Sequence, residues 1–549
     1  MKDFLYKTLD NWEHWQGILP NRLKPFVHKF DTNTSKWIYD VNTGRIVRVD
    51  AVVWDIIDEY GILTRDEIIE KYTNRHSSVK IGGAYDEITD ARENQRLFLA
   101  EYPNEDEIVF KKEKSHVERE LEGNLKGLSL CVTEACNFRC SYCIYGGRYD
   151  DWRRHSEKRL SERHALAAIN DFLKHSRYKE IGEPRILTFY GGEPLLELSL
   201  IKKCVGHVKE KGQNDISFSL VTNGYLLTED VGNFLASNRF HIQVSMDGPR
   251  QIHDRNRRHC NGSGTYDTIA ENVRYFVEKH PEYTSNGRLQ IHATLTLSGN
   301  AQEVQSFFCS DQFDLCDTKV FVRLNPVALS GFPDKTLPDP SDPSRVPGLD
   351  LLHNEYLNFC AEDRVDPRSR AWAIMETLFQ NGYLDVHRRA VALKGEQLKG
   401  GFLGPQSICI PGWLRLFVDT NGDYYPCEQV PTLNAFKLGS VEKGIDISYA
   451  FDLITQFMSL NHHQCVFCWC VRNCRVGCLA SVKALTEGEK RKACAKYRRI
   501  CHDRLIRYCK VLETNPRAFD HLNKGEGRDI IVPIKRSEKD WEPSLTMPP

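Results

Sequence analysis

Residues 128–143 read LSLCVTEACNFRCSYC and decide the fold, because a short apolar run is followed at once by closely spaced cysteines. The run 128–132 is typical of a buried strand. Cys136, Cys140 and Cys143 then form a C-x3-C-x2-C loop. Three thiolates can hold three irons of a [4Fe–4S] cluster and leave the fourth iron open to another ligand. A zinc site is the alternative, but structural zinc favours paired C-x2-C spacing and four ligands, and no fourth Cys or His lies close downstream.

An alternation of strand and helix patterns continues from this loop. Further strand candidates are 185–190 (RILTFY), 216–221 (ISFSLV), 241–246 (HIQVSM), 289–297 (LQIHATLTL) and 320–324 (VFVRL). Amphipathic stretches such as Glu162 to Lys174 and Thr265 to Lys279 separate them. This order predicts parallel βαβ units and therefore an open or partial barrel of the α/β class. In such barrels the chemistry lies at the carboxyl ends of the strands.

Small and polar residues stand at these strand ends in chain order. They are Gly191, Gly192 and Glu193 after the second strand, Asn223 after the third, and Ser245 and Asp247 after the fourth. The glycines lack a Cβ and let a ligand approach the backbone, while Glu193 offers an acceptor for an ammonium group. Ser245 and Asp247 can hydrogen-bond a ribose or a carboxylate. Each motif alone is usually a turn, but their order at successive strand ends indicates one site.

The cysteine loop resembles the signature of the radical S-adenosylmethionine (SAM) superfamily. The resemblance implies a partial (β/α)6 barrel and a catalytic [4Fe–4S] cluster whose open iron binds SAM. It also implies that the Gly-Gly-Glu motif binds the methionine amino group. The residues expected to contact SAM are Tyr142, Tyr145, Gly191, Gly192, Glu193, Asn223, Ser245 and Asp247. The implied chemistry is reductive cleavage of the sulfonium to a 5′-deoxyadenosyl radical, which abstracts unactivated hydrogen atoms.

A second cysteine set lies near the C-terminal end. Its spacing resembles the seven-cysteine SPASM extension of radical enzymes that modify peptides and proteins. The resemblance implies two auxiliary [4Fe–4S] clusters, one on Cys409, Cys427 and Cys478, the other on Cys465, Cys468, Cys474 and Cys494. A pair of zinc sites is the alternative, because C-x2-C pairs are equally good zinc ligands.

We also propose roles for three residues outside these motifs. Cys470 is extra to the pattern and is a candidate fourth ligand of the Cys409 cluster, which otherwise lacks one. Glu428 follows Cys427 directly, where relatives that oxidise proteins carry an acidic base, so we expect a catalytic proton acceptor; an ordinary solvated carboxylate is the alternative. Arg257 is a candidate contact to a carboxylate, or a structural residue.

The N-terminal part predicts a separate small domain. Residues 36–50 form a hairpin pattern joined at Asn42-Thr43-Gly44, and helical patterns follow over 51–60, 64–72 and 85–98. This winged-helix-like outline resembles the PqqD-like element that binds leader peptides in ribosomal-peptide biosynthesis, where the leader adds as a strand to the sheet edge. A DNA-binding winged helix has the same outline, but the module is not markedly basic.

Composition limits the partners and the cellular location that we expect for this protein. The 549 residues carry a net charge of −1, which favours neither nucleic acid nor a membrane surface as partner. The sequence has no export signal and no apolar run long enough to span a bilayer, so we expect a cytoplasmic protein. Of its 19 cysteines, the clustered ones are expected to serve metal or redox chemistry, whereas the scattered ones are more typical of buried apolar residues. The predicted domains are 1–105 (peptide recognition), 106–125 (linker), 126–345 (barrel), 346–405 (bridging helices), 406–515 (SPASM) and 516–549 (tail).

Together these features predict a peptide-modifying enzyme. It would bind a precursor peptide by its leader, abstract a hydrogen atom, pass the resulting electron to the auxiliary clusters and form a thioether or carbon–carbon crosslink. Its electron donor would be a flavodoxin or ferredoxin. One alternative is oxidation of a Cys or Ser side chain in a partner protein, as sulfatase maturases do. Another is a non-catalytic iron–sulfur escort that binds a peptide for another enzyme.

Overall fold

The computed structural model describes most of the chain. The described residues are 24–103, 114–147, 153–176, 185–213, 215–311, 313, 320–326, 346–366, 369–391, 409–460, 462–474 and 476–522. The expected tail 516–549 and the end of the bridging helices therefore lie largely outside them. No described helix is long and apolar enough to cross a bilayer.

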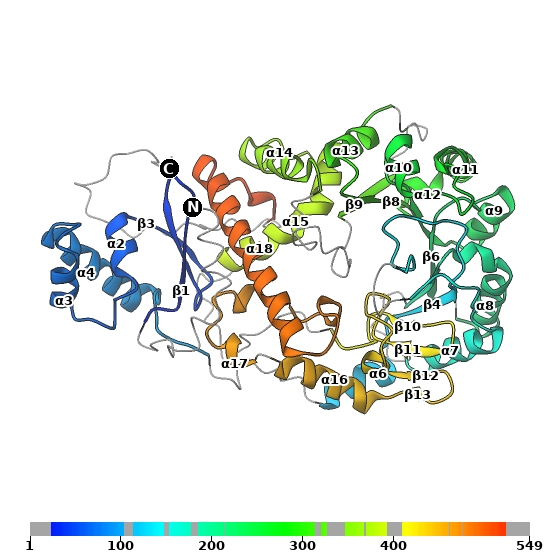
Figure 1. Ribbon diagram of the computed structural model, residues 1–549, viewed down its shortest axis with the longest axis horizontal. Helices are drawn as coiled ribbons and strands as arrows, with labels where there is room; N and C mark the ends of the chain where they lie inside the picture. The colour runs from blue at the N-terminus through cyan, green and yellow to red at the C-terminus, as the bar shows by residue number, and fades with distance from the viewer. Residues whose placement is uncertain are drawn as a thin grey trace.

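A ten-stranded sheet forms the core of the larger part of the described structure, on the right in Figure 1. Six of its strands run parallel in the order β4-β5-β6-β7-β8-β9. Their bounds are β4 Gly127–Thr133, β5 Arg185–Gly191, β6 Ile216–Thr222, β7 His241–Ser245, β8 Leu289–Leu295 and β9 Phe321–Pro326. Each agrees with a predicted strand, so the α/β class is confirmed.

Amphipathic helices connect these strands and cover the sheet. They are α7 Glu162–Lys174, α8 Leu198–Glu210, α9 Glu229–Ser237, α10 Arg250–Asn256, α11 Tyr266–Lys279, α12 Glu282–Ser285 and α13 Ala301–Cys309. In α7 the buried residues Ala165, Ala168, Ile169 and Phe172 follow a helical period and form one apolar face. The Ser161 hydroxyl caps the first turn by accepting from His164 N.

Four short strands of the C-terminal region extend this sheet. They are β10 Leu416–Val418, β11 Asp423–Tyr425, β12 Gly439–Ser440 and β13 Gly444–Ile445. Strand β10 pairs in parallel with β4, so that Phe417 lies opposite Ser129. The boundary expected at residue 406 therefore does not separate two independent sheets. Strands of two or three residues carry no readable periodicity, which is why sequence patterns did not show this join.

The remaining helices link the sheet to the N-terminal part. They are α6 Lys114–Gly123, α14 Leu349–Ala361, α15 Arg370–Val391, α16 Ile447–Ser459, α17 His462–Cys465 and α18 Glu487–Thr514. Short 3-10 turns lie at η2 Pro194–Glu197, η4 Asn434–Phe436, η5 Val471–Asn473, η6 Leu479–Ser481 and η7 Asp520–Leu522. Helix α6 falls in the predicted linker 106–125, but it buries Val117 and Leu121 and contacts α16. It is an anchored helix.

The N-terminal module has its own sheet and core. Its elements are β1 Val27–Asp31, β2 Lys36–Asp40, β3 Ile46–Val49, α2 Ala51–Ile56, α3 Arg65–Tyr72 and α4 Ser78–Gln95. The predicted hairpin and three helices are confirmed, whereas β1 was not predicted. Helix α4 begins at Ser78 instead of Tyr85, because Ser77 caps it and outweighs the low helix propensity of Gly82 and Gly83.

The module docks on the C-terminal helix α18, which lies between it and the sheet (Figure 1). Glu513 on α18 accepts hydrogen bonds from Trp37 Nε1 at 2.8 Å and from Thr32 Oγ1 at 2.6 Å. His28 stacks on Trp469 with ring centroids 3.6 Å apart and hydrogen-bonds to His502 at 2.9 Å. Polar contacts with a charged acceptor and a stacked ring pair therefore fix the module on this helix.

We expect the Glu513→Ala substitution to loosen the module without unfolding the sheet. It removes a charged acceptor from Trp37 and Thr32, which should weaken the docking by about 2 kcal/mol. Hydrogen exchange followed by mass spectrometry should show faster exchange in β1 and β2 and unchanged exchange in β4 to β8. The control is Lys510→Ala, an exposed position on the same helix. Equal protection of β1 in both variants would contradict the assigned role of Glu513.

Candidate functional site

The first three thiols lie together on the loop that leaves β4. Burial above all raises the pKa of Cys136 to about 12, and the neighbouring thiols Cys140 and Cys143 add to this. The segment after β7 holds the loop from the other side, since Ser141 N donates to the Asn256 carbonyl at 2.8 Å. The structure thus brings the three predicted ligands to one partly buried place at the carboxyl end of β4.

The chemistry of this donor set fits a cationic iron–sulfur group. Burial raises the pKa of Cys140 to about 12 as well, so these thiols ionise only beside a positive partner. Backbone amides already point at two sulfurs: Phe138 N lies 3.3 Å from Cys136 Sγ, and Tyr145 N lies 3.4 Å from Cys143 Sγ. Among the described residues no three His, Cys, Asp or Glu side chains are placed to hold a single metal ion.

Gly191 and Gly192 pack against the loop that carries the thiols. A Cβ at Gly192 would lie 2.2 Å from the Ala135 carbonyl oxygen. At Gly191, whose φ is +139°, it would lie 2.2 Å from the Thr133 carbonyl oxygen. Gly192 N also donates to Thr133 O at 2.8 Å. The cysteine loop itself therefore occupies the space that a side chain would fill at either glycine. The absence of side chains serves this packing as well as the approach of the expected ligand.

Glu193 accepts hydrogen bonds from the chain's own donors. Its buried carboxylate accepts from Leu195 N at 3.0 Å, Thr222 Oγ1 at 2.7 Å and Asn223 N at 2.7 Å. Burial raises its pKa to about 7, although these hydrogen bonds act in the opposite direction. An ionised carboxylate has about four acceptor positions, which leaves one for the predicted ammonium contact. Glu193 therefore also joins the ends of β5 and β6, a role that the sequence did not indicate.

Asp247, Arg257 and Tyr142 form one buried cluster beside the thiols. The Tyr142 hydroxyl donates to Asp247 Oδ2 at 2.6 Å, and Arg257 Nε pairs with Asp247 Oδ1 at 3.0 Å. Thr294 N donates to the same oxygen at 3.0 Å. The Arg257 guanidinium lies 5.4 Å from the centroid of the Tyr142 ring. The contacts expected of Asp247 and Arg257 with a ribose or carboxylate thus compete with an ion pair inside the chain.

The remaining predicted SAM contacts differ in their surroundings. Asn223 Nδ2 donates to Asn137 Oδ1 at 2.8 Å and ties the end of β6 to the cysteine loop. Ser245 ends β7 and is half-buried. The Tyr145 hydroxyl lies 3.4 Å from Cys131 Sγ in the core. Asn223 is therefore adjacent to the cysteine loop, whereas the Tyr145 hydroxyl contacts a core residue.

Glu428 is a buried carboxylate and not a solvated one. It is 5% exposed, and its Oε1 pairs with Arg415 at 2.6 Å. Its Oε2 is buried without a hydrogen-bond partner among the described residues. Burial raises the pKa of Tyr190 well above its usual value, and the charges of Glu428 and Cys143 contribute. Tyr190 on β5 is therefore close enough to both Cys143 and the Glu428 carboxylate for their charges to act on it.

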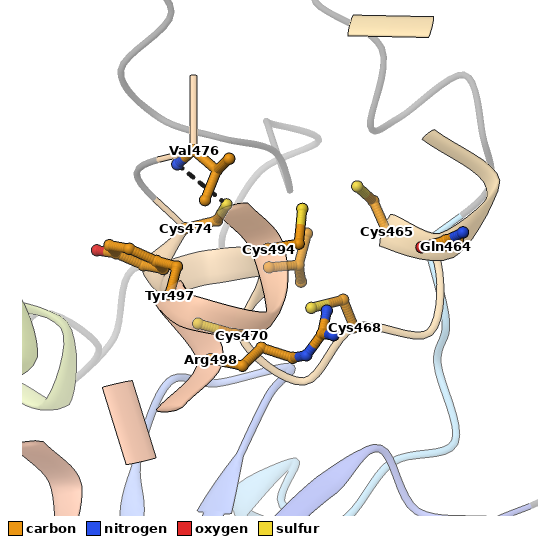
Figure 2. A pocket seen from close by; sticks show the side chains of 10 residues that line it. Gln464, Cys465, Cys468, Cys470, Cys474, Val476, Cys494, Tyr497 and Arg498 are labelled. Atoms are coloured by element: carbon orange, nitrogen blue, oxygen red, sulfur yellow. Dashed lines mark hydrogen bonds between the residues drawn. The ribbon is translucent and has the colours of Figure 1, made fainter. Parts of the chain in front are cut away.

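The C-terminal cysteines separate into the two groups that the resemblance implied. One group is Cys409, Cys427 and Cys478, the other Cys465, Cys468, Cys474 and Cys494. Burial raises the pKa of both Cys427 and Cys465 to about 12, and each is affected further by thiols of its own group. The second group lines a common pocket (Figure 2).

Cys470 belongs with the second group. It is 1% exposed, and its thiol hydrogen-bonds with that of Cys501. Its other thiol neighbours are Cys468 and Cys474, and it lines their pocket. The hypothesis that Cys470 completes the Cys409 group is therefore wrong. Spacing along the chain could not place it, because the cysteines of the two groups interleave in sequence.

Sequence reasoning missed several charged residues at these sites. Arg153 donates to the Glu428 carbonyl and lies 4.4 Å from the centroid of Phe417. No sequence pattern marks it. Lys490 and Arg498 are different, because they stand four residues before and after Cys494 on a helix. That spacing places all three on one face and could have identified both cations.

Comparisons with known proteins identify part of the chain. The family model of the radical SAM superfamily matches residues 130–289, from β4 to the start of β8. A cysteine-type anaerobic sulfatase-maturating enzyme of Clostridium novyi (strain NT) is 25% identical over 64% of this chain and 88% of its own. The radical SAM cyclopropyl synthase TigE of Paramaledivibacter caminithermalis is 24% identical over 41% of this chain and 48% of its own. The solved structure of native anSMEcpe with bound AdoMet is 21% identical, with a TM-score of 0.49, and covers 72% of this chain and 99% of that chain.

We expect the Gly192→Ala substitution to remove iron from the first loop. The added methyl group would meet the Ala135 carbonyl at 2.2 Å and push the cysteine loop away from β5. Anaerobically reconstituted protein should therefore lose roughly four irons per chain, the content of one cluster. Iron and sulfide analysis measures the loss.

The matched control for this variant is Gly206→Ala on α8. A Cβ there meets nothing within 4 Å, so the helix should gain up to about 1 kcal/mol and the iron content should not change. Full iron content in the Gly192→Ala protein would show that the close approach is not needed to form the site.

Proposed function

We propose that this chain, an enzyme of the radical SAM superfamily, is a maturase of ribosomally made peptides. It would bind a precursor peptide by its leader and install an intramolecular thioether or carbon–carbon crosslink in the core. When bound at Cys136, Cys140 and Cys143, a cluster with SAM supplies a radical that abstracts hydrogen atoms. The chain's own residues position the peptide, exclude water and accept the proton that leaves.

The docking of the N-terminal module on the cluster-bearing region carries this proposal. Trp469 stands between Cys468 and Cys470, and its ring stacks on His28 of β1. Within the described residues β3 pairs only with β2, so the outer edge of β3 can offer its backbone groups to an added strand. A leader bound there would be held on the same rigid body as the auxiliary cysteines.

Charge supports a peptide in preference to nucleic acid at this module. Several of its cations are paired with carboxylates: Lys24 and Lys29 lie 2.6 and 2.7 Å from Asp58, and Lys71 lies 2.6 Å from Glu59. A surface that neutralises phosphates needs cations that are not already compensated. Peptide recognition by strand addition needs none, since backbone hydrogen bonds supply the affinity.

Glu428 is our candidate proton acceptor. Its Oε2 is buried without a partner among the described residues, and such an oxygen is costly unless a donor arrives. Arg415 holds Oε1 at 2.6 Å and orients the group. The charges of Glu428 and of Cys143 both act on Tyr190, which supports a position of this carboxylate near the first loop. A substrate group between the first loop and Cys427 could lose its proton to Glu428 and its electron to the auxiliary group.

Oxidation of a Cys or Ser side chain in a partner protein is the second candidate. The sulfatase-maturating relative of Clostridium novyi favours it, since the similarity extends over 64% of this chain. The same thiol sets and the same base would serve that reaction. The two candidates differ in the N-terminal module, because only the first needs a leader to be bound there.

We expect the Glu428→Gln substitution to slow peptide modification by about 10²–10⁴-fold, the usual contribution of one acid–base group. The amide keeps the size and the contact to Arg415 but cannot accept the proton. Cofactor cleavage without peptide should continue. The control is Glu442→Gln, an exposed carboxylate of the same region, which should leave the rate unchanged. An unchanged rate in the Glu428→Gln protein would remove Glu428 from the reaction.

Truncation separates the two candidate functions. We expect a chain that lacks residues 1–105 to lose modification of a leader-bearing precursor peptide while it still cleaves SAM. Anaerobic incubation with candidate precursors, followed by mass spectrometry, should show with the full chain the loss of one hydrogen pair per crosslink. If the truncated chain instead retains its activity and converts Cys or Ser to an aldehyde in a partner protein, the maturase proposal fails in favour of the second candidate.

A further inference from the structure

We infer that Lys490 and Arg498 set the reduction potential of the cluster held by the second C-terminal cysteine group and keep it above that of the cluster at Cys427. We call the second group, Cys465, Cys468, Cys474 and Cys494, the outer set, and Cys409, Cys427 and Cys478 the inner set. The inference rests on the proposed function, because it needs both sets to hold iron–sulfur clusters.

Helix geometry places both cations on the outer set. Lys490, Cys494 and Arg498 are spaced at i, i+4 and i+8 on α18, and residues four apart share one face of a helix. The Thr486 side chain accepts from Glu489 N and caps the helix just before this face begins. The helix therefore delivers one thiolate ligand with a cation on each side of it.

Arg498 contacts the thiols directly. It lines the pocket of the outer set, and Figure 2 shows its guanidinium beside Cys468. Burial alone would lower the pKa of Arg498, but Cys468 and Cys494 raise it above its usual value, Cys468 also as a hydrogen-bond partner. A guanidinium that donates to a cluster sulfur stabilises the added negative charge when the cluster is reduced.

Lys490 lies on the other side of Cys494 and is 4% exposed. Its ammonium group donates to the Val476 carbonyl at 2.9 Å and lies 3.1 Å from the centroid of the Phe457 ring. Within the described residues no carboxylate pairs with it. A buried cation without a carboxylate is costly, and the thiolates of the outer set are the anions near enough to compensate it.

The inner set has different surroundings. Glu428 follows Cys427 directly and is 5% exposed, whereas the side chain of its ion-pair partner Arg415 is 57% exposed, so solvent screens the cation more than the carboxylate. At Cys465 of the outer set, both cations oppose the effect of burial. Reduction adds one negative charge, so cations raise a cluster's potential and a carboxylate lowers it. An electron taken from the substrate by the inner cluster would therefore pass to the outer cluster. This one-electron transfer oxidises the inner cluster again and reduces the outer cluster, and no proton is transferred.

The test is a redox titration of the full chain followed by electron paramagnetic resonance. Replacing Cys136, Cys140 and Cys143 by Ala removes the first cluster, so that only the two auxiliary clusters titrate. In this background we expect Arg498→Gln and Lys490→Met each to lower the higher of the two potentials. The expected shift is about 59 mV for one electron, which corresponds to a tenfold change in the equilibrium constant of reduction. The lower potential should stay in place.

Charge-preserving variants and a distant cation serve as controls. Arg498→Lys and Lys490→Arg should keep the potential near its original value. Lys492→Met removes an exposed cation of the same helix, paired with Glu489, and should move neither potential. Unchanged potentials in the Arg498→Gln and Lys490→Met proteins, or equal shifts in the charge-preserving pair, would overturn the inference. Absence of iron from the unaltered chain would overturn the proposed function as well.

Discussion

The close backbone approach between the turn after β5 and the loop after β4 governs the whole site. Gly192 lies so near Ala135 that no side chain fits between them. Parallel pairing of β4 with β5 sets this approach, since the register aligns Thr133 with Gly191. In this position the three thiols of the loop are partly buried and close enough to affect one another's pKa. Burial makes their ionisation costly, and a cationic cluster offsets that cost. The fold and the cofactor therefore depend on each other.

The same sheet also positions the second half of the chemistry. Because β10 pairs with β4, the C-terminal region is built onto the strand that carries the first cysteine loop. Arg153 then reaches from the barrel to the Glu428 carbonyl, and the charges of both Cys143 and Glu428 act on Tyr190 of β5. In the function proposed above, a substrate group in this region would meet the hydrogen-abstracting centre and the proposed proton and electron acceptors.

Sequence patterns predicted the parts of this arrangement that repeat locally. The six parallel strands, α7 and the hairpin of the N-terminal module follow short apolar runs or periods of two or 3.6 residues, which a sequence shows directly. The cysteine groups followed from a family resemblance. The join of β10 to β4 has no such period, and the role of Gly192 depends on a neighbour more than fifty residues away. The placement of Cys470 with Cys501, and the pairing of Asp247 with Arg257, likewise depend on packing that no spacing rule contains.

The position of the N-terminal module constrains any peptide that it binds. Figure 1 shows α18 between this module and the ten-stranded sheet, and Trp469 joins the module to the loop of the outer set. A peptide anchored at the edge of β3 must therefore pass α18 before its core reaches the first cysteine loop. An extended chain covers about 3.3–3.6 Å per residue, so the length of the segment between leader and core determines which residues can reach the site. Residues too close to the leader could not reach the site, and the selection of the modified residue would follow from this geometry as much as from side-chain recognition.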